Sequence, residues 1–371
     1  MEKVPIRRLA LWFVASRLAL LLVAWLALRF VPPGEFPVHF EFDQWLFHWD
    51  AGWYFSIAQK GYSYVPQAQS NVAFFPLYPL LAHLLGLVVP NLLVAGYLVS
   101  NGFLFGSCLL LWKLTVRFYG APERADRAVL FFLLCPMTVF YSSFYTESQF
   151  FFLALSVAWL AGERRWLAAG ACGFLAALTR PPGALLAVLI VAEYVMVLRQ
   201  RRRDRDQPWF AWKEAAQVAG AIVLNVMGIV AFACYIGARF GDPMILFTVH
   251  AFWHHQSVPL WHIFWAGAIY HAFYIVWFYG AMSVALALLA RGVAYRLRPS
   301  HLVLAFAFFL LYCSNNLLEA MPRYLSVVFP FYIVAAEFSL RRPRMGLILL
   351  GASAALAVLS VVLFVDGYWL T

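Results

Sequence analysis

Long apolar runs constrain the fold of this chain more than any other feature. Residues 9–31, 215–236, 266–290 and 345–365 each reach or exceed the roughly 20 residues that a helix needs to cross a bilayer. Hydrophobic residues make up 64% of the chain and charged residues 12%, whereas soluble domains hold about 45–50% and about 25%. One core cannot bury so much apolar surface, so we predict an all-α integral membrane protein. The first run is too long for a signal-peptide core and is expected to be a retained anchor.

Polar segments divide the whole chain, as a single polytopic membrane domain over 1–371, into eleven predicted spans. With the N-terminus in the cytoplasm, 21 of the 27 Lys and Arg residues fall on the cytoplasmic side, as the positive-inside rule requires. The formal net charge of +10 therefore needs no nucleic-acid partner. The predicted spans are 9–31, 91–112, 128–144, 148–162, 166–180, 183–198, 215–236, 264–290, 300–316, 323–339 and 345–365.

The segment from Phe74 to Pro90 decides which side the later loops face. It is apolar but short, and it contains Pro76, Pro79 and His83. If it spanned the membrane, every later basic loop would face outward, so we expect an interfacial helix instead. Residues 32–90 then form one long outer segment.

The four predicted spans between 128 and 198 are short for a bilayer. Fifteen residues of helix cover about 22 Å, less than the roughly 30 Å hydrocarbon core. Glu147 and Arg180 lie at the two outer turns of this region, so we expect a charged site below the outer surface. The five cysteines all lie in apolar runs, which argues against disulfides and a thiolate metal site.

The first outer segment holds two candidate carboxylates among aromatic residues, Asp43 and Asp50. Either carboxylate is also interpretable as a helix N-cap. For Asp50 that alternative is supported by Gly61, which suits the C-terminal end of a helix beginning near residue 50. The Trp and Tyr residues around Asp50 are also typical of an interfacial belt.

Arg180, Arg323 and Glu147 are three isolated charges at predicted outer turns. Guanidinium groups bind phosphate oxygens bidentately, which makes both arginines candidates for a phosphate site. The alternatives are snorkelling for Arg180, an ion pair with Glu319 for Arg323, and a favourable helix N-terminal charge for Glu147. Arg17, within the first span, is expected to make structural contacts in the bundle.

Metal and nucleotide signatures are weak or missing. The loop from Arg239 to His262 holds four histidines, of which His250 and His254 have helical spacing, but no third ligand is evident. A divalent metal is therefore open but not indicated. The sequence has no P-loop and no dinucleotide-binding glycine motif.

Several motifs together resemble the PIG-V family, the GPI mannosyltransferase II proteins and their bacterial relatives, in the GT-C class of membrane glycosyltransferases. Their order and spacing run from the first predicted span to the tenth. They are His48-Trp49-Asp50-Ala-Gly-Trp53-Tyr54, Ala73-Phe-Phe-Pro76-Leu-Tyr78-Pro79-Leu80, Tyr145-Thr-Glu147-Ser148, Leu178-Thr-Arg180-Pro181, Gly241-Asp242-Pro243 and Pro322-Arg323-Tyr324.

The resemblance implies a GT-C-type bundle of about eleven transmembrane helices, with interfacial helices in the first outer loop. It also implies an inverting transferase that takes a hexose, by family analogy mannose, from a polyprenyl-phosphate donor to a lipid- or glycan-linked acceptor. Asp50 would be the catalytic base, because a carboxylate is ionised at neutral pH and can accept the acceptor hydroxyl's proton. Asp43 and Glu147 are possible supporting acids, and Arg180 and Arg323 would bind the donor phosphate. The candidate substrate-pocket residues are His48, Trp49, Trp53, Tyr54, Tyr78, Tyr145, Asp242 and Tyr324.

The expected location is the bacterial plasma membrane, with the active site on the extracytoplasmic face. The expected partners are membrane lipids, the polyprenyl-phosphate sugar and the acceptor, while the oligomeric state stays open. The alternative function is a polytopic transporter or lipid flippase, which would place more charged residues in mid-membrane and often shows internal repeats.

Overall fold

The computed structural model describes residues 3–32, 44–204, 210–253, 259, 272–314, 318–368 and 370. Within these residues every regular element is a helix, which confirms the all-α fold. The α-helices are α1 (Ile6–Phe30), α2 (Asp50–Lys60), α3 (Leu77–Gly86), α4 (Leu92–Tyr119), α5 (Pro122–Leu133), α6 (Glu147–Gly162), α7 (Trp166–Ala177), α8 (Leu186–Arg203), α9 (Trp212–Phe240), α10 (Ile245–Thr248), α12 (Ala272–Ala294), α13 (Pro299–Cys313), α14 (Met321–Ser326), α15 (Pro330–Arg341) and α16 (Pro343–Val365). Short 3₁₀ helices are η2 (Asn71–Ala73), η3 (Pro181–Leu185), η4 (Val249–Trp253) and η7 (Leu318–Ala320).

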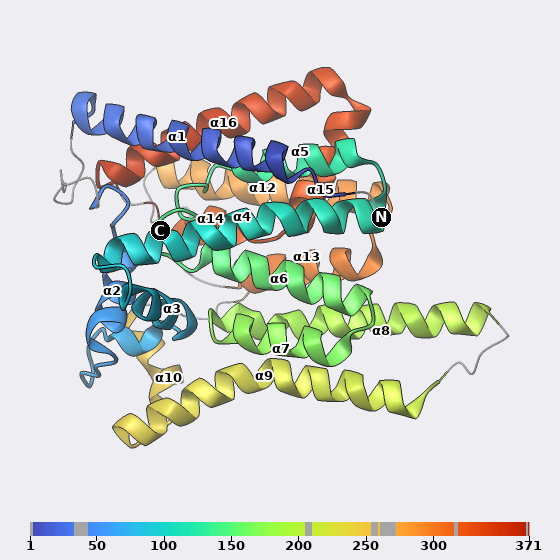
Figure 1. Cartoon of the computed structure of the whole chain (residues 1–371), viewed down its shortest axis with the longest axis horizontal. Helices are drawn as coiled ribbons and strands as arrows, with labels where there is room; N and C mark the ends of the chain where they lie inside the picture. Colours follow the sequence, from blue (N-terminus) through green and yellow to red (C-terminus); the bar gives the residue numbers. More distant parts are fainter. Residues whose placement is uncertain are drawn as a thin grey trace.

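The long helices run side by side along one axis of the molecule (Figure 1). By length and composition, six helices in the described part of the chain are long and apolar enough to cross a membrane, and four shorter apolar helices accompany them. The six are Ile6–Phe30, Leu92–Tyr119, Pro181–Arg203, Trp212–Phe240, Ile275–Ala294 and Pro343–Val365. The multi-pass membrane character is confirmed, whereas the count of eleven spans is not.

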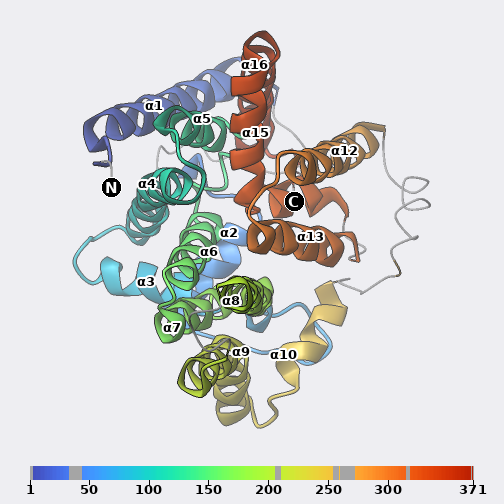
Figure 2. The ribbon, with the colours of Figure 1, turned by 90° about the vertical axis from the view of Figure 1, so that its right-hand side faces the viewer.

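The two ends of the bundle differ in what they carry. Helices α2, α3 and α10 gather at the left-hand end in Figure 1, where the chain also ends, while the N-terminus lies towards the other end. Viewed along the bundle in Figure 2, α3 lies across the end instead of running parallel to the long helices. The segment predicted not to span therefore forms a short helix at that end.

The predicted span 128–144 is wrong in its second half. Helix α5 ends at Leu133, and residues 134–146 form a buried, non-helical segment. Pro136 has no N–H to continue the helix, so the carbonyls at the end of α5 need other donors. Arg17 Nη2 donates to Leu133 O at 3.1 Å, and Ser353 Oγ donates to Leu134 O at 2.8 Å. A backbone outside regular structure is stable at this depth because protein groups satisfy it.

Arg17 is the principal support of this segment. Its Nη1 donates to Ser142 Oγ at 2.9 Å and its Nη2 to Thr138 Oγ1 at 2.8 Å. These contacts confirm the structural role expected for Arg17 in the bundle.

The predicted span 323–339 is also interrupted. Helix α14 ends at Ser326 and α15 begins at Pro330. Pro330 cannot donate to the carbonyl four residues earlier, which belongs to Ser326. The hydroxyls of Tyr141 and Tyr332 donate to that carbonyl instead, at 2.9 and 2.6 Å. The break leaves the short helix α14 facing the bundle interior.

Glycines let α7 and α9 pack closely. A Cβ at Gly170 on α7 would lie 2.6 Å from the backbone of Ala221, and one at Gly228 on α9 would lie 2.4 Å from Phe174 O. Small residues at a helix contact are typical of packing within membranes. The contact positions the end of α7, where Arg180 follows.

Candidate active site

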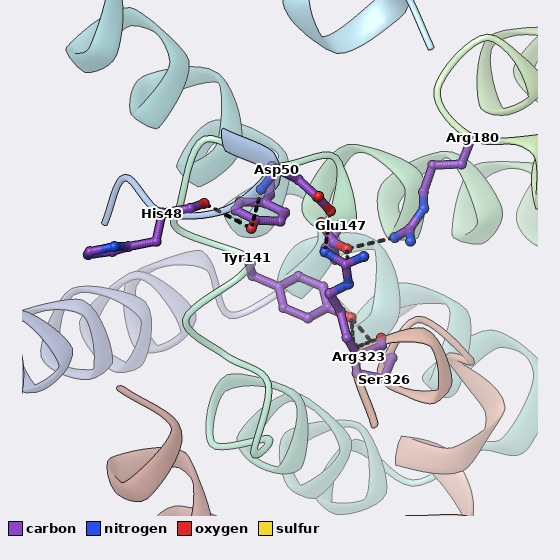
Figure 3. Close-up of polar contacts among 8 residues, drawn as sticks. His48, Asp50, Tyr141, Glu147, Arg180, Arg323 and Ser326 are labelled. Carbon is purple, nitrogen blue, oxygen red and sulfur yellow. Dashed lines mark hydrogen bonds and ion pairs between the residues drawn. The ribbon is translucent and has the colours of Figure 1, made fainter. Parts of the chain in front are cut away.

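Four charged side chains from four separate parts of the fold meet near the end of the bundle that carries α2 and α3 (Figure 3). Arg323 Nη1 donates to Asp50 Oδ2 at 2.8 Å, and Arg180 Nη1 donates to Glu147 Oε1 at 2.7 Å. Arg323 Nε also lies 3.6 Å from Glu147 Oε1. Two carboxylates and two guanidinium groups thus form one continuous cluster whose formal charges balance.

Asp50 is the first residue of α2, and its carboxylate points to Arg323. The capping alternative is wrong, because the N-cap position is Trp49 and no side chain caps it. Trp49 has a φ of +56°, a left-handed conformation that is strained for a bulky residue. The Asp50 side chain is 26% exposed, the highest value among the four charged residues, so it remains accessible.

Tyr145 holds the start of α2 in place. Its hydroxyl donates to the carbonyl of His48 at 3.0 Å and accepts from the N–H of Asp50 at 3.2 Å. The strained turn at Trp49 is therefore bonded on both sides to the segment that precedes α6. These bonds fix the position of the Asp50 carboxylate.

Glu147 joins the two arginines. It begins α6, so its negative charge also suits the helix N-terminus, and its side chain is only 1% exposed. Oε1 faces both guanidinium groups, while the buried Oε2 has no hydrogen-bond partner among the described residues. The carboxylate thus keeps one free acceptor.

The two arginines turn inward, so the snorkelling alternative for Arg180 is wrong. Their guanidinium carbons lie 5.4 and 5.2 Å from the ring centre of Tyr324, and that of Arg323 lies 5.5 Å from the ring of Tyr145. Burial alone lowers the pKa of a guanidinium, but Glu147 raises that of Arg180 above its ordinary value. Asp50 and Glu147 likewise raise the pKa of Arg323 against the effect of burial. Both groups are therefore permanently charged.

Other predicted aromatic residues pack α2 against the segment that follows it. Tyr54 packs edge-on against Tyr78, with ring centres 5.8 Å apart, and Trp53 stacks on Phe74 at 6.0 Å. Burial raises the pKa of Tyr54, so its hydroxyl stays protonated. Tyr78 is fully buried and bonds to Gly96 O and Ser100, which makes its contacts structural.

Asp242 stands apart from the cluster. Its Oδ1 accepts from the N–H of Met244 at 2.8 Å, a local turn bond, and the residue is exposed. Asp43, His254, His255 and His262 lie outside the described residues. Within the described part of the chain, no three His, Cys, Asp or Glu residues gather as a metal site.

Three aromatic residues of the site had no place in the sequence prediction. Phe140 lies 5.5 Å from the Arg323 guanidinium, Tyr312 stacks on Tyr324 at 5.2 Å, and Trp253 packs edge-on against Trp53 at 4.9 Å. Phe140 and Tyr312 lie within predicted spans, where an aromatic residue is not distinctive. Only Trp253, in the histidine-rich loop, carried a signal that it lay near the predicted outer surface.

Comparison with known proteins agrees with the motifs. Residues 37–180 match the family model described as Mannosyltransferase (PIG-V). The chain is 29% identical over 169 residues to GPI mannosyltransferase 2 of Drosophila melanogaster, covering 38% of this chain and 37% of that protein. It is 31% identical over 120 residues to GPI mannosyltransferase 2 of Drosophila pseudoobscura pseudoobscura, covering 30% and 26%. The matches thus span about a third of these relatives.

Two solved structures share the fold over nearly the whole chain. They are ArnT from Cupriavidus metallidurans bound to undecaprenyl phosphate, with a TM-score of 0.58 and 18% identity, and the same protein in the apo state, with 0.57 and 16%. They cover 93% and 96% of this chain and 63% and 75% of those chains. The segment that matches the family contains Asp50, Glu147 and Arg180. The resemblance to the PIG-V mannosyltransferases is therefore confirmed over residues 37–180, on a bundle of the GT-C type.

Proposed function

We propose that this chain is an inverting membrane glycosyltransferase that transfers a hexose, mannose by family analogy, from a polyprenyl-phosphate donor to a lipid- or glycan-linked acceptor. The observation that carries the proposal is the cluster of Asp50, Arg323, Glu147 and Arg180. The reaction takes place on the extracytoplasmic face of a plasma membrane, bacterial by the resemblance.

Asp50 is the proposed base. The acceptor oxygen attacks the anomeric carbon of the donor, the bond from that carbon to the phosphate oxygen breaks, and the acceptor proton moves to an Asp50 oxygen. Arg323 holds Oδ2 at 2.8 Å, which favours the ionised carboxylate. Because Asp50 is the most exposed of the four charged residues, it is the carboxylate best placed to meet an acceptor. A single displacement inverts the anomeric configuration.

Arg180 and Arg323 are proposed to bind the donor phosphate. A guanidinium carries five N–H donors, and each arginine uses few of its donors in hydrogen bonds within the cluster. Arg323 Nε has no hydrogen-bond partner among the described residues. Positive groups fixed in advance stabilise the charge that develops on a leaving phosphate. The leaving polyprenyl phosphate then needs no general acid.

Unpaired polar atoms close to the cluster are suited to sugar hydroxyls. Glu147 Oε2, Ser148 Oγ and Tyr312 Oη are buried and lack partners among the described residues. Buried polar atoms in proteins are nearly always hydrogen-bonded, so a polar ligand is expected to satisfy them. We assign Glu147 to the sugar site as well as to the arginines. Asp43 and Asp242 remain candidates for supporting roles near the acceptor.

The distribution of basic residues supports placing the site on the outer face. Most basic residues lie in loops at the end of the bundle opposite α2 and α3, among them those after α6, α8, α12 and α15. The positive-inside rule assigns that end to the cytoplasm. A lipid donor is consistent with the shared fold of ArnT, which has been solved with undecaprenyl phosphate bound.

The direct test uses membranes that contain the full chain and polyprenyl-phosphate [³H]mannose. Label is expected to appear in a lipid or glycan fraction, and the lipid co-purified with the protein is expected to include a polyprenyl phosphate. Arg180→Gln and Arg323→Gln should each lose donor binding and transfer. Arg239→Gln, an exposed arginine of α9 at the same end, is the matched control. Movement of labelled lipid across the membrane without any transfer would favour the transporter or flippase alternative.

A further inference from the structure

A second basic site lies at the opposite end of the bundle from the candidate active site. It is a cavity of about 430 Å³ lined by Arg291, Tyr295, Phe338, Arg341, Arg342 and Met345. These residues come from the last turn of α12 and the residue after it, the end of α15 and the start of α16 (Figure 1). A smaller cavity of about 110 Å³ shares Tyr295 and Arg341 with it and is also lined by Tyr119 and Arg124.

Two of the three arginines in this cavity have no carboxylate partner in the described structure. Arg341 donates to Glu337 at 2.6 Å, and Glu337 also pairs with Arg124. Arg291 and Arg342 form no ion pair within the described ranges. At the same end, Arg117 is paired with Glu163 and Arg298 with Glu193. The cavity therefore has excess positive charge.

Aromatic rings orient the guanidinium groups of the cavity. The Arg341 guanidinium carbon lies 4.4 Å from the ring centre of Tyr295, and that of Arg291 lies 5.9 Å from the ring of Phe338. A guanidinium held on a ring face keeps its edge free for hydrogen bonds. Several such edges around one cavity suit the oxygens of a phosphate group.

The position of the cavity indicates a lipid rather than a soluble ligand. It lies at the ends of two helices that are long and apolar enough to span a membrane, Ile275–Ala294 and Pro343–Val365, where phospholipid headgroups are found. Met345, Leu347 and Ile348 on the first turns of α16 are more than half exposed, so apolar surface for acyl chains adjoins the basic cavity. Basic pockets between membrane helices on the cytoplasmic side bind anionic headgroups.

We propose that Arg291, Arg341 and Arg342 form a binding site for the phosphate of an anionic phospholipid, separate from the candidate active site. The lipid bridges the ends of α12, α15 and α16. Only residues 327–329 separate α15 from α14, so the bound lipid also restrains the element that carries Arg323. The proposal does not depend on which reaction the chain performs.

Binding of phosphatidylglycerol to the purified full chain in a non-ionic detergent, followed by native mass spectrometry, tests the site. Arg291→Gln combined with Arg342→Gln should weaken binding about ten-fold or more, because two charged donors to the phosphate are lost. Both residues are exposed, so the variant is expected to fold. Arg344→Gln removes one charge from the exposed start of α16, at a position that does not line the cavity, and it should bind as the wild type does.

Equal binding by the double variant and the wild type would overturn the site. An equal loss of lipid binding in Arg344→Gln would show that the loss comes from general surface charge, which would also overturn the site. Displacement of the lipid by inorganic phosphate at the same concentration would make the site one for a soluble anion and contradict the lipid assignment. Phosphatidylcholine, which carries no net charge, should compete poorly.

Discussion

Arg323 and Asp50 are 273 positions apart in the sequence, and a hydrogen bond of 2.8 Å joins their side chains. The bond connects α2, in the first predicted outer loop, to α14, near the end of the chain. Its two residues meet only when the whole bundle has assembled. The accessible carboxylate and the buried guanidinium are thus parts of one folded site rather than of a local motif.

The buried pair of Arg180 and Glu147 should contribute far more to stability than an exposed pair of the same length. Both Arg180–Glu147 and Arg117–Glu163 have N–O distances of 2.7 Å, but the second pair is much more exposed. Glu147→Gln leaves the buried Arg180 without its carboxylate partner, although Arg323 keeps Asp50, and should lower the unfolding free energy by about 3–5 kcal/mol. Glu163→Gln should cost at most about 1 kcal/mol. Denaturation by SDS in mixed micelles measures both, and equal losses would contradict the assigned burial.

Arg17 should not tolerate replacement by lysine. Its guanidinium donates hydrogen bonds to Leu133 O, Thr138 and Ser142 at once. A lysine ammonium cannot reproduce that planar arrangement of donors. Arg17→Lys should lower stability by about 1–3 kcal/mol for each lost bond to the charged group. Arg29→Lys, on the exposed end of the same helix, should have almost no effect in the same assay. If Arg17→Lys left the unfolding free energy unchanged, residues 134–146 would have to be held by other contacts.

Two helical glycines should respond oppositely to replacement by alanine. At Gly170 the added Cβ would meet the Ala221 backbone at 2.6 Å, whereas at Gly102 it meets nothing within 4 Å. Gly170→Ala should separate α7 from α9 at a cost of about 1–3 kcal/mol. Gly102→Ala should be neutral or stabilising by up to about 1 kcal/mol, because alanine favours the helix. Melting temperatures in detergent distinguish these outcomes, and a harmless Gly170→Ala would contradict the close contact.

Asp366 should make stability depend on pH. It follows α16 with 1% of its surface exposed, and burial raises its pKa to about 6. A raised carboxyl pKa means that the folded state favours the protonated form, so this stabilisation is present at low pH and lost as the pH rises through about 6. The wild type should therefore lose more stability between pH 5 and 7 than Asp366→Asn, in which the group does not titrate. Parallel pH profiles for the two proteins would refute the assignment.

The apolar runs predicted the long helices well because hydropathy is local. The predicted spans 9–31 and 345–365 correspond to Ile6–Phe30 and Pro343–Val365. Pro136 is a local signal that a helix ends near residue 134, but the non-helical form of 134–146 also depends on Arg17, which lies more than a hundred residues earlier in the chain. A contact over that separation leaves no local pattern.

The four charged residues of the cluster could be named from the sequence, but their ion pairs could not. Asp50, Glu147, Arg180 and Arg323 were all predicted to belong to it, from isolated charges at outer turns and from the motifs. The ion pairs among them follow from how α2, α6, α7 and α14 pack, which the sequence does not encode locally. Asp242, chosen by its motif, instead makes a turn bond of its own.

The most direct measurement is the transfer rate of Asp50→Asn with polyprenyl-phosphate [³H]mannose. The asparagine keeps the size of the side chain and cannot accept the proton, so kcat should fall by about 10²–10⁴-fold. The variant should still fold and bind the donor lipid, because Arg323 keeps its ion pair with Glu147 and Arg180 keeps its hydrogen bond to Glu147. Asp204→Asn, an exposed aspartate at the opposite end of the bundle, should transfer at the wild-type rate. Full transfer activity in a folded Asp50→Asn variant would contradict the assignment of Asp50 as the base.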